Sequence, residues 1–236
     1  FVIDNLNRDR KIRLYLPKNY SDSSKRYPVL YMHDGQNLFD NSTSYAGEWN
    51  IDESLNQLEL SNLELIVVGI DNGEEKRWNE LSPWENKKYG KAEGAEYMEF
   101  IVNQIKPFID STYRTISNRK NTAIIGSSMG GLISHYAICR YPEVFGKAAI
   151  FSPSYWYSKE VYNYTRNNLF PRSTKLFLGV GKKEGEMVDA SQKMYDYILN
   201  TDHPAENLIL RIDPDGDHNE SAWGKQFIPA IKWLFE

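Results

Sequence analysis

Hydrophobic positions along the chain gather into short runs that end at glycine, proline, asparagine or aspartate. These continuous runs lie in YPVLYMHDG, LELIVVGIDNG, NTAIIG, KAAIFSP, TKLFLGVG and NLILRID. Runs of this length, rich in β-branched residues, are typical of strands buried in a mostly parallel sheet. An earlier segment, KIRLYLP, alternates polar and apolar positions instead, as a half-exposed strand does. The pattern therefore predicts a strand at each of these places.

Between the runs, hydrophobic residues recur at the spacing of amphipathic helices. One such face extends from Tyr97 to Ile109, and Pro107 is expected to kink that helix or end it early. Further helices are predicted in GLISHYAICRY, MVDASQKMYDYIL and SAWGKQFIPAIKWLF, where Pro229 could interrupt the last one. Alternating strands and helices predict a single α/β domain over residues 1–236, with helices on both faces of the sheet.

The segment from Asn72 to Gly94 interrupts this alternation. It is long and polar and contains two tryptophans, Trp78 and Trp84. A loop of this length in a compact domain is usually functional or mobile. We therefore expect the segment to contribute to a site or to move.

Composition and charge narrow the choice of partners. The chain is 41% hydrophobic and 25% charged, which are the proportions of a folded globular protein. Its net charge of −4, without any Lys/Arg block, argues against nucleic acid as a partner. No apolar run is long enough to span a membrane. The oligomeric state is left open by these features.

Cysteine usage and the start of the chain bear on the compartment. Cys139 is the one cysteine, so no internal disulfide can form. The chain opens at Phe1 without a signal-peptide pattern, so we expect a mature chain or a domain of something longer. A cytoplasmic enzyme and an exported bacterial enzyme both fit this description.

The stretch Gly126-Ser127-Ser128-Met129-Gly130 directly follows a predicted strand and opens a predicted helix. In that context the G-x-S-x-G pattern marks Ser128 as a nucleophile on a sharp turn. Such a turn brings backbone segments close together, so side chains at the flanking glycines would clash. The helix that follows directs its free N–H groups toward an oxyanion. The alternative is a purely structural Gly/Ser-rich turn.

A serine nucleophile needs a base, which in this kind of fold comes last, after the serine and an acid. Only four histidines are present. His33 precedes the serine, His135 falls inside the predicted helix after it, and His203 is expected in an exposed loop. His218 follows the last predicted strand and precedes the last helix, where a loop at the sheet edge delivers an imidazole. We therefore assign His218 as the base.

The acid is expected in the loop after TKLFLGVG, which reads KKEGEMVDA. Glu184 is the first candidate there, with Glu186 and Asp189 as alternatives. The oxyanion would be bound by two backbone N–H groups, those of Met129 and of Gln36 in the loop after an early strand.

Metal chemistry is not expected. The stretch DPDGDHNE places acidic residues at alternate positions, as calcium loops do. Its sixth position is His218 rather than glycine and its twelfth is Gly224 rather than glutamate, which argues against calcium. No Cys/His cluster suggests zinc. We expect neither a metal nor an organic cofactor.

A larger set of motifs resembles the esterase D/putative esterase family of α/β-hydrolases. These motifs follow one another along nearly the whole chain: RKIRLYLPKNY, YPVLYMHDGQNLFD, EWNIDESL, IVVGIDNG, SPW, IIGSSMGGLISHYA, YPEVFGKAAIFSPSYW, GKKEGE and GDHNESAW. The family includes carbohydrate esterases, siderophore trilactone esterases, S-formylglutathione hydrolases and mycolyltransferases. The resemblance implies one α/β-hydrolase domain over residues 1–236 that acts as a serine esterase.

The resemblance also implies roles for individual residues. Ser128 matches the nucleophile and His218 the base. Glu184, third after the glycine that ends its strand, matches the acid, where many relatives have aspartate. Gln36 and Met129 match the two oxyanion donors. Trp49 matches an aromatic position that relatives often place near the site.

The substrate class is indicated less directly. The HDGQN loop and the segment RWNELSPWEN are more similar to the carbohydrate and siderophore branches than to formylglutathione hydrolases. Trp84, Tyr155 and Trp156 are candidates for binding a sugar or a phenolic acid. We therefore favour an acetyl-type or feruloyl-type ester of carbohydrate.

Three alternatives stay open. A siderophore trilactone esterase would need a basic cleft, to which Arg77, Lys87 and Lys88 could contribute. An acyltransferase would use the same triad and differ in how the site holds an acceptor alcohol. A non-catalytic binding domain would lack a member of the triad, and none is missing from the sequence.

Overall fold

The computed structural model describes residues 1–59 and 62–236 and is built around a seven-stranded sheet. The strand order is β3-β5-β4-β6-β7-β8-β9, with β3 antiparallel to β5 and every other neighbouring pair parallel. A separate antiparallel pair joins β1 and β2. The strands are β1 (Val2–Ile3), β2 (Arg8–Asp9), β3 (Ile12–Tyr15), β4 (Val29–His33), β5 (Ile66–Ile70), β6 (Thr122–Ser127), β7 (Lys147–Phe151), β8 (Lys175–Gly181) and β9 (Leu208–Asp213).

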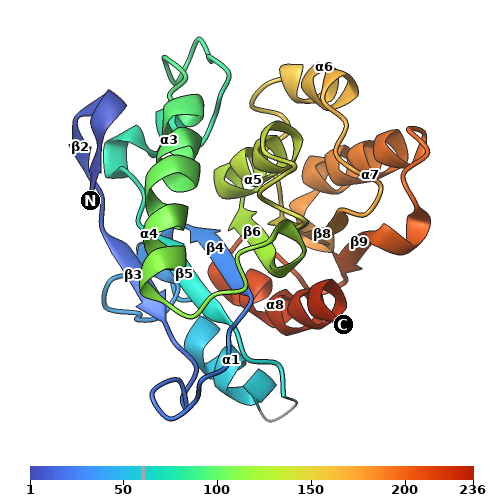
Figure 1. Ribbon diagram of the computed structural model, residues 1–236. Helices are drawn as coiled ribbons and strands as arrows, with labels where there is room; N and C mark the ends of the chain where they lie inside the picture. Colours follow the sequence, from blue (N-terminus) through green and yellow to red (C-terminus); the bar gives the residue numbers. More distant parts are fainter. Residues whose placement is uncertain (60–61) are drawn as a thin grey trace.

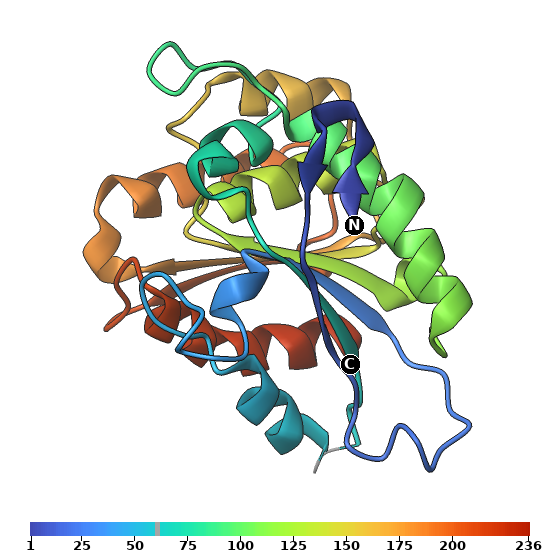
Figure 2. The same cartoon turned by 90° about the vertical axis from the view of Figure 1, so that its left-hand side faces the viewer.

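Helices cover both faces of this sheet (Figures 1 and 2). One face carries α1 (Ile51–Glu59) and α8 (Glu220–Phe235). The other carries α3 (Gly94–Phe100), α4 (Lys106–Thr112), α5 (Met129–Arg140), α6 (Glu160–Asn167) and α7 (Glu186–Leu199). Shorter helical turns are α2 (Arg77–Glu80), η1 (Asp4–Leu6), η2 (Gly35–Asn37), η3 (Glu74–Lys76), η4 (Ile101–Ile105), η5 (Arg119–Asn121), η6 (Lys182–Glu184) and η7 (Ala205–Asn207).

The two layers of helices bury two hydrophobic clusters, one on each face. Successive residues of a strand point to opposite faces, so Tyr31 joins the cluster beneath α3 to α7. Leu30 and Met32, on either side of it, join the cluster beneath α1 and α8. The central strands are buried on both faces, which explains their continuous apolar sequence. The predicted α/β fold is confirmed, and each predicted strand segment contains a strand.

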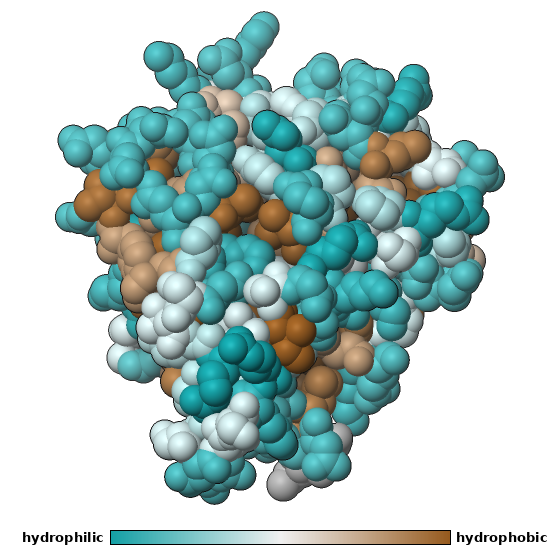
Figure 3. Space-filling model, in the orientation of Figure 1, coloured by the Kyte–Doolittle hydropathy of each residue, from teal (hydrophilic) through white to brown (hydrophobic). Residues whose placement is uncertain are grey.

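The surface agrees with this arrangement. In the view of Figure 3, hydrophilic residues cover most of the face, and hydrophobic ones appear only in small separate patches. Within residues 1–59 and 62–236, no helix combines the length and the hydropathy needed to cross a bilayer.

Two prolines behave differently from the expectation drawn from their sequence. Helical backbone continues from α3 through η4 and α4 to Thr112, so Pro107 does not end the helix. A π-helical turn, Ile101–Ile105, comes directly before it and changes the local hydrogen-bond spacing where the proline N–H is missing. Pro229 lies inside α8, which continues to Phe235 without interruption.

The segment from Asn72 to Gly94 is held against the rest of the protein by buried charges. Glu80, at the end of α2, is fully buried and accepts hydrogen bonds from Arg8 Nη1 (3.0 Å) and Arg10 Nη2 (2.8 Å). Arg10 is itself only 4% exposed. The ion pairs therefore attach this long segment to the first ten residues of the chain.

Replacing Glu80 by glutamine tests that attachment. Glu80→Gln leaves the Arg10 cation buried without a countercharge, and we expect it to lower the free energy of unfolding by about 3 kcal/mol. Urea denaturation followed by circular dichroism measures the change. As a control, Glu64→Gln removes the partner of the exposed Lys25 and should hardly move the midpoint. Equal midpoints for the two variants would contradict this account of Glu80.

Candidate active site

Ser128 occupies a strained turn between a buried strand and a buried helix. β6 ends at Ser127 and α5 begins at Met129. The backbone of Ser128 has φ 56° and ψ −118°, a combination that residues with a side chain rarely adopt. Its N–H donates to Phe151 O (2.9 Å), and its carbonyl accepts from Ser154 N (3.0 Å). One bond to the last residue of β7 and one to the loop after it therefore keep this conformation in place.

The glycines around the serine explain why the turn can close. A Cβ atom on Gly126 would lie 2.4 Å from the carbonyl oxygen of Gly130, which no rearrangement of a side chain could relieve. The expected clash at this position is confirmed. At Gly130 an added Cβ would meet His33 Cβ at 3.3 Å, which is tight but less severe.

The structure brings together the three side chains singled out in the sequence. His218 Nε2 lies 3.1 Å from Ser128 Oγ, and His218 Nδ1 lies 2.7 Å from Glu184 Oε2. Ser128 follows β6, Glu184 follows β8 and His218 follows β9, so all three lie at the carboxyl ends of parallel strands. These ends lie along one edge of the sheet, which is where sites form in folds of this kind.

Glu184 is fixed from several directions. Its side chain is 1% exposed, and its second oxygen accepts from the Gly181 N–H (2.6 Å) and from Ser152 Oγ (2.6 Å). Ser152 Oγ in turn accepts from Trp223 Nε1 at 2.8 Å. These donors stabilise the charged carboxylate and aim its free oxygen at His218.

The alternative acids are not part of this arrangement. Glu186 and Asp189 lie in the first turn of α7, where acidic side chains suit the helix dipole. Among the residues that the structure describes, neither makes a hydrogen bond to His218.

The other three histidines are held elsewhere. Burial lowers the pKa of His33 to about 4 and that of His135 to about 3. The hydroxyl of Tyr97 lies 2.8 Å from His33 Nδ1, and that of Tyr155 lies 2.7 Å from His135 Nδ1. His203 is buried against the Thr174 carbonyl, 3.0 Å from its Nε2. Each therefore has a structural partner, and none of these partners is Ser128.

Two backbone N–H groups are available to bind an oxyanion. Met129 is the first residue of α5, and Gln36 lies in η2, directly after β4. Neither N–H donates a hydrogen bond within residues 1–59 and 62–236. η2 packs so closely on β5 that a Cβ atom added to Gly35 would lie 2.7 Å from the Gly69 carbonyl carbon. The Asn72 N–H donates to Gln36 Oε1 (3.1 Å), which helps to hold this turn.

Ser128, His218 and Gln36 line a cleft with a volume of about 840 Å³. It is lined by Asp34, Gln36, Asn37, Thr43, Ser44, Tyr45, Ala46, Asn72, Glu74, Glu75, Arg77, Trp78, Ser127, Ser128, His218, Glu220 and Trp223. The lining residues come from the loops after β4, β5, β6 and β9. A cleft of this size accommodates a substrate larger than a simple acetate.

The charged lining is dominated by carboxylates. Arg77 binds Asp34 through two hydrogen bonds, Nε to Oδ1 (2.6 Å) and Nη2 to Oδ2 (2.8 Å). Burial alone would raise the pKa of Asp34, but Arg77 outweighs it and the pKa lies below its usual value. Burial raises the pKa of Glu220, whose Oε1 accepts from Asn37 Nδ2 at 3.2 Å. Arg77 is thus neutralised by its partner, while Glu74, Glu75 and Glu220 add acidity.

The structure does not bring Trp49 into the cleft. It is 4% exposed and packs against Trp223 and Phe151, with ring centroids 5.7 and 5.5 Å away. Trp223 in turn packs edge-on against His218, at 5.0 Å. Trp49 therefore supports the wall behind the histidine and does not face substrate.

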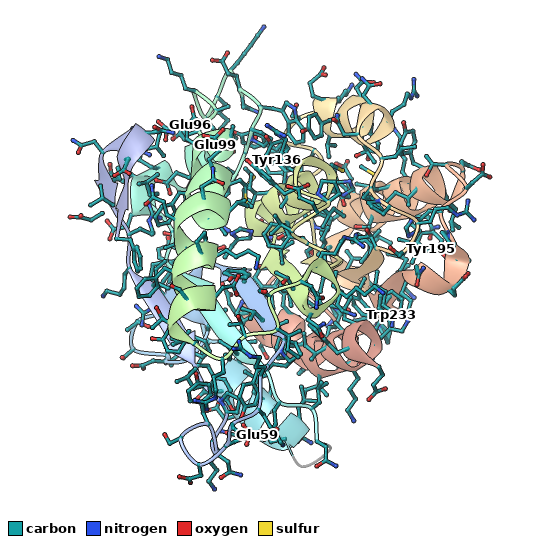
Figure 4. The ribbon with its side chains drawn as sticks, viewed as in Figure 1. Glu59, Glu96, Glu99, Tyr136, Tyr195 and Trp233 are labelled. Carbon is teal, nitrogen blue, oxygen red and sulfur yellow. The ribbon has the colours of Figure 1, made fainter. Side chains whose placement is uncertain are left out.

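The remaining aromatic candidates differ in their placement. Trp84 packs edge-on against Tyr136 of α5, which is labelled in Figure 4, and does not line the cleft. Tyr155 is 2% exposed and its hydroxyl contacts His135, so its proposed contact with substrate does not fit. Trp156 is 53% exposed and lies beside the cleft lining, against Trp78.

Sequence reasoning missed several residues of the site. Ser152 and Trp223, which support Glu184, were not singled out, and neither was Glu220. The position of Ser152 directly after β7 was an available signal, because the ends of parallel strands meet at one edge. The spacing of Trp223, five residues after His218, gives no such indication by itself.

One group of acidic residues could hold a metal ion. Side-chain oxygens of Glu48, Asp52 and Glu53 lie within 4.8 Å of one another. None of the three lines the cleft or contacts the Ser128–His218–Glu184 arrangement. Exposed carboxylates often gather in this way without binding an ion, so the group carries no role here.

A sharp strand–serine–helix turn on a mostly parallel sheet, with an imidazole and a carboxylate in line, defines an α/β-hydrolase. The chain belongs to the family described as "Putative esterase", whose model matches residues 3–234. The family resemblance found in the sequence is thereby confirmed, and the protein is a carboxylic ester hydrolase.

Individual relatives cover most of the chain. It is 30% identical to the uncharacterized protein YbbA of Bacillus subtilis, over 96% of this chain and 93% of that protein. It is 24% identical to an endo-1,4-beta-xylanase/feruloyl esterase of Xylanibacter ruminicola, over 89% of this chain and 27% of that protein. A solved siderophore hydrolase of Aspergillus nidulans superimposes with a TM-score of 0.80 at 22% identity, covering 96% of this chain and 89% of that one.

Removing the Ser152 hydroxyl tests whether it positions the acid. Ser152→Ala deletes a hydrogen bond to a charged carboxylate, and we expect kcat/KM for p-nitrophenyl acetate to fall about tenfold. Ser191→Ala makes the same change at a buried serine of α7 and should leave kcat/KM unchanged. Melting temperatures of both variants separate a loss of folding from a loss of positioning. An unchanged rate in Ser152→Ala would remove Ser152 from the site.

Proposed function

We propose that the protein is a serine esterase in which Ser128 is the nucleophile, His218 the base and Glu184 the orienting acid. The observation that carries this proposal is the continuous chain of contacts from Ser128 Oγ through His218 to Glu184 at the cleft. Serine becomes nucleophilic only when a base accepts its proton, and the base needs a partner that fixes its tautomer. The geometry meets both conditions.

The reaction would proceed in two steps. Ser128 Oγ attacks the ester carbonyl while His218 Nε2 takes its proton, and the tetrahedral intermediate expels the alcohol, which leaves with that proton. A water molecule, activated by His218, then attacks the acyl-enzyme and releases the acid. Glu184, hydrogen-bonded to Nδ1, stabilises the imidazolium that forms in each step. No group beyond these side chains is required to balance the protons.

The oxyanion of each tetrahedral intermediate would be bound by the N–H groups of Gln36 and Met129. Both are free to donate and come from turns held rigidly by the packing described above. Such donors act most strongly when they are already in place before charge develops. Each one typically contributes about 10²–10³ in rate.

We further propose that the natural substrate is an acetyl-type or feruloyl-type ester of carbohydrate. The charged lining supports this choice, because three carboxylates and a neutralised Arg77 disfavour an anionic ligand and accept hydrogen bonds from hydroxyl groups. The relative from Xylanibacter ruminicola, described as a feruloyl esterase, supports the same class.

Hydrolysis of a siderophore ester is the second candidate, supported by the fold shared with the siderophore hydrolase of Aspergillus nidulans. The basic cleft that such a ligand requires is not apparent in the lining, since Arg77 is paired and neither Lys87 nor Lys88 contributes to it. Acyl transfer would use the same triad and would appear as faster acyl-enzyme breakdown when an acceptor sugar is added.

A substrate panel tests the reaction and its class together. We expect wild-type protein to hydrolyse methyl ferulate or acetylated xylan faster than p-nitrophenyl acetate, and a catecholate trilactone poorly. Ser128→Ala should remove at least about 10³-fold of each activity while leaving the melting temperature near that of the wild type. Substantial turnover by Ser128→Ala would overturn the triad. Preferred turnover of the trilactone would overturn the carbohydrate class and leave the triad standing.

The choice of acid has its own test. Glu184→Gln keeps the size of the side chain but loses the charge that fixes the imidazole, and we expect kcat to fall about 10²-fold or more. Glu186→Gln, two residues further along, should change kcat by less than about twofold, because in the described part of the chain Glu186 makes no hydrogen bond to His218. Stopped assays of both variants on the same ester measure the difference, and a reversed order would reassign the acid to Glu186.

A further inference from the structure

Four aromatic residues pack together beside the cleft, and the proposed reaction uses none of them. Trp78, which lines the cleft, lies parallel to Tyr89, with ring centroids 4.3 Å apart and planes 8° from parallel. Tyr157 extends the stack, 5.5 Å from Tyr89 at 24°. Trp156 meets Trp78 and Tyr89 at 6.2 and 6.3 Å, inclined by about 60°. We call Trp78, Tyr89, Trp156 and Tyr157 the aromatic platform.

The platform is assembled from two segments that are far apart in the sequence. Trp78 and Tyr89 belong to the segment from Asn72 to Gly94, and the other two rings belong to the loop after β7. Asn86 Nδ2 donates to the Tyr157 carbonyl (2.8 Å), and the Tyr157 hydroxyl donates to the Trp78 carbonyl (3.3 Å). These bonds hold the rings in position before any ligand binds, which lowers the entropic cost of binding.

Part of the aromatic platform is exposed to solvent. Tyr157 is 3% exposed and acts as its buried base, whereas Trp156 is 53% exposed. A single exposed ring is common on protein surfaces, but Trp156 extends a cluster of rings at the edge of a cleft, and exposed apolar clusters of this kind mark binding surfaces. The loop that carries Trp156 also contains Ser154, whose hydroxyl lies 3.2 Å from Ser128 Oγ. Trp78 lines the same cleft as Ser128, so the platform adjoins the reacting centre.

We propose that the aromatic platform binds the sugar rings of the alcohol part of the ester, outward from Ser128. This inference rests on the carbohydrate class proposed above and names the surface that recognises it. A pyranose ring has flat C–H faces that pack against an indole while its hydroxyl groups stay at the rim. An open platform suits this geometry, and the carboxylates of Glu74 and Glu75 line the same cleft as Trp78, where they can accept hydrogen bonds from hydroxyls.

The platform fits a sugar better than the phenolic ring of a feruloyl group. A phenolic ring gains most when both of its faces are covered by protein, which requires a closed slot. Trp156 is half-exposed and offers one open face. The phenolic acid is therefore assigned to the cleft at Ser128, and the sugar chain to the platform.

Binding without catalysis tests the platform directly. Isothermal titration of Ser128→Ala with unesterified xylotetraose and cellotetraose should show binding of at least one of them. Adding Trp156→Ala should weaken that binding about three- to tenfold, the range expected for one aromatic contact. Trp156→Phe should restore most of it. Leu169→Ala, which truncates another side chain that is 53% exposed, serves as the matched control and should have no effect.

Kinetics on two esters provide the second measurement. Trp156→Ala should lower kcat/KM for a feruloylated xylo-oligosaccharide about three- to tenfold, chiefly through KM, and leave p-nitrophenyl acetate hydrolysis unchanged. An equal loss on both esters would show that Trp156 only supports the site. Weaker binding of free ferulic acid by Trp156→Ala, with tetrasaccharide binding unaffected, would assign the platform to the acyl group. Either result overturns the proposal.

The outcomes separate this inference from the function on which it rests. If the wild type cleaves the oligosaccharide ester and Trp156→Ala equals it, the platform is wrong and the carbohydrate class stands. If neither tetrasaccharide binds Ser128→Ala, the platform is overturned whichever ester the wild type cleaves. If the tetrasaccharide binds through Trp156 while only a trilactone is hydrolysed, the substrate class fails, and the platform is a sugar-binding surface that does not hold the alcohol part of the ester.

Discussion

The buried carboxylate of Glu184 is the interaction on which the rest of the site depends. It contacts His218 after β9, Ser152 after β7 and the last N–H of its own strand, β8. Three neighbouring strand ends are therefore connected through one charged group. A carboxylate that is 1% exposed is stable only when its oxygens are satisfied, so the same hydrogen bonds that preserve its charge also fix the loops. Stability and the alignment of the imidazole follow from one set of contacts.

The hydrophobic pattern predicted the α/β class and all seven strands of the main sheet, but not α1, α6 or the β1–β2 pair. Continuous apolar runs are a strong signal because the central strands are buried on both faces. The prediction for the helix containing Pro107 was less accurate. A π-helical turn before the proline accommodates it, and such a turn cannot be recognised from the spacing of hydrophobic residues. The order Ser128, Glu184, His218 is enough to nominate these residues, since the fold brings the carboxyl ends of successive parallel strands to one edge.

The substrate-binding residues could not be predicted in the same way. Whether a tryptophan faces solvent, supports a wall or lies in the core depends on packing between distant segments. Trp49 is buried among other rings and Trp84 packs against Tyr136, whereas Trp78, which the sequence did not nominate, lines the cleft. Arg77 could be noticed as a charge, but only the structure shows that Asp34 neutralises it. Local motifs thus nominate the candidate catalytic residues, and long-range contacts determine what surrounds them.

The backbone conformation of Ser128 lowers the stability of the fold while it places the side-chain hydroxyl. A non-glycine residue at φ 56° and ψ −118° typically costs about 1–3 kcal/mol, which the surrounding structure must offset. Thermal stability alone would therefore favour glycine at this position, where the proposed mechanism requires a hydroxyl. Glycine at this position would relieve the strain and remove the hydroxyl that lies 3.1 Å from His218 Nε2. The same backbone conformation therefore lowers the stability of the fold and sets the position of Oγ.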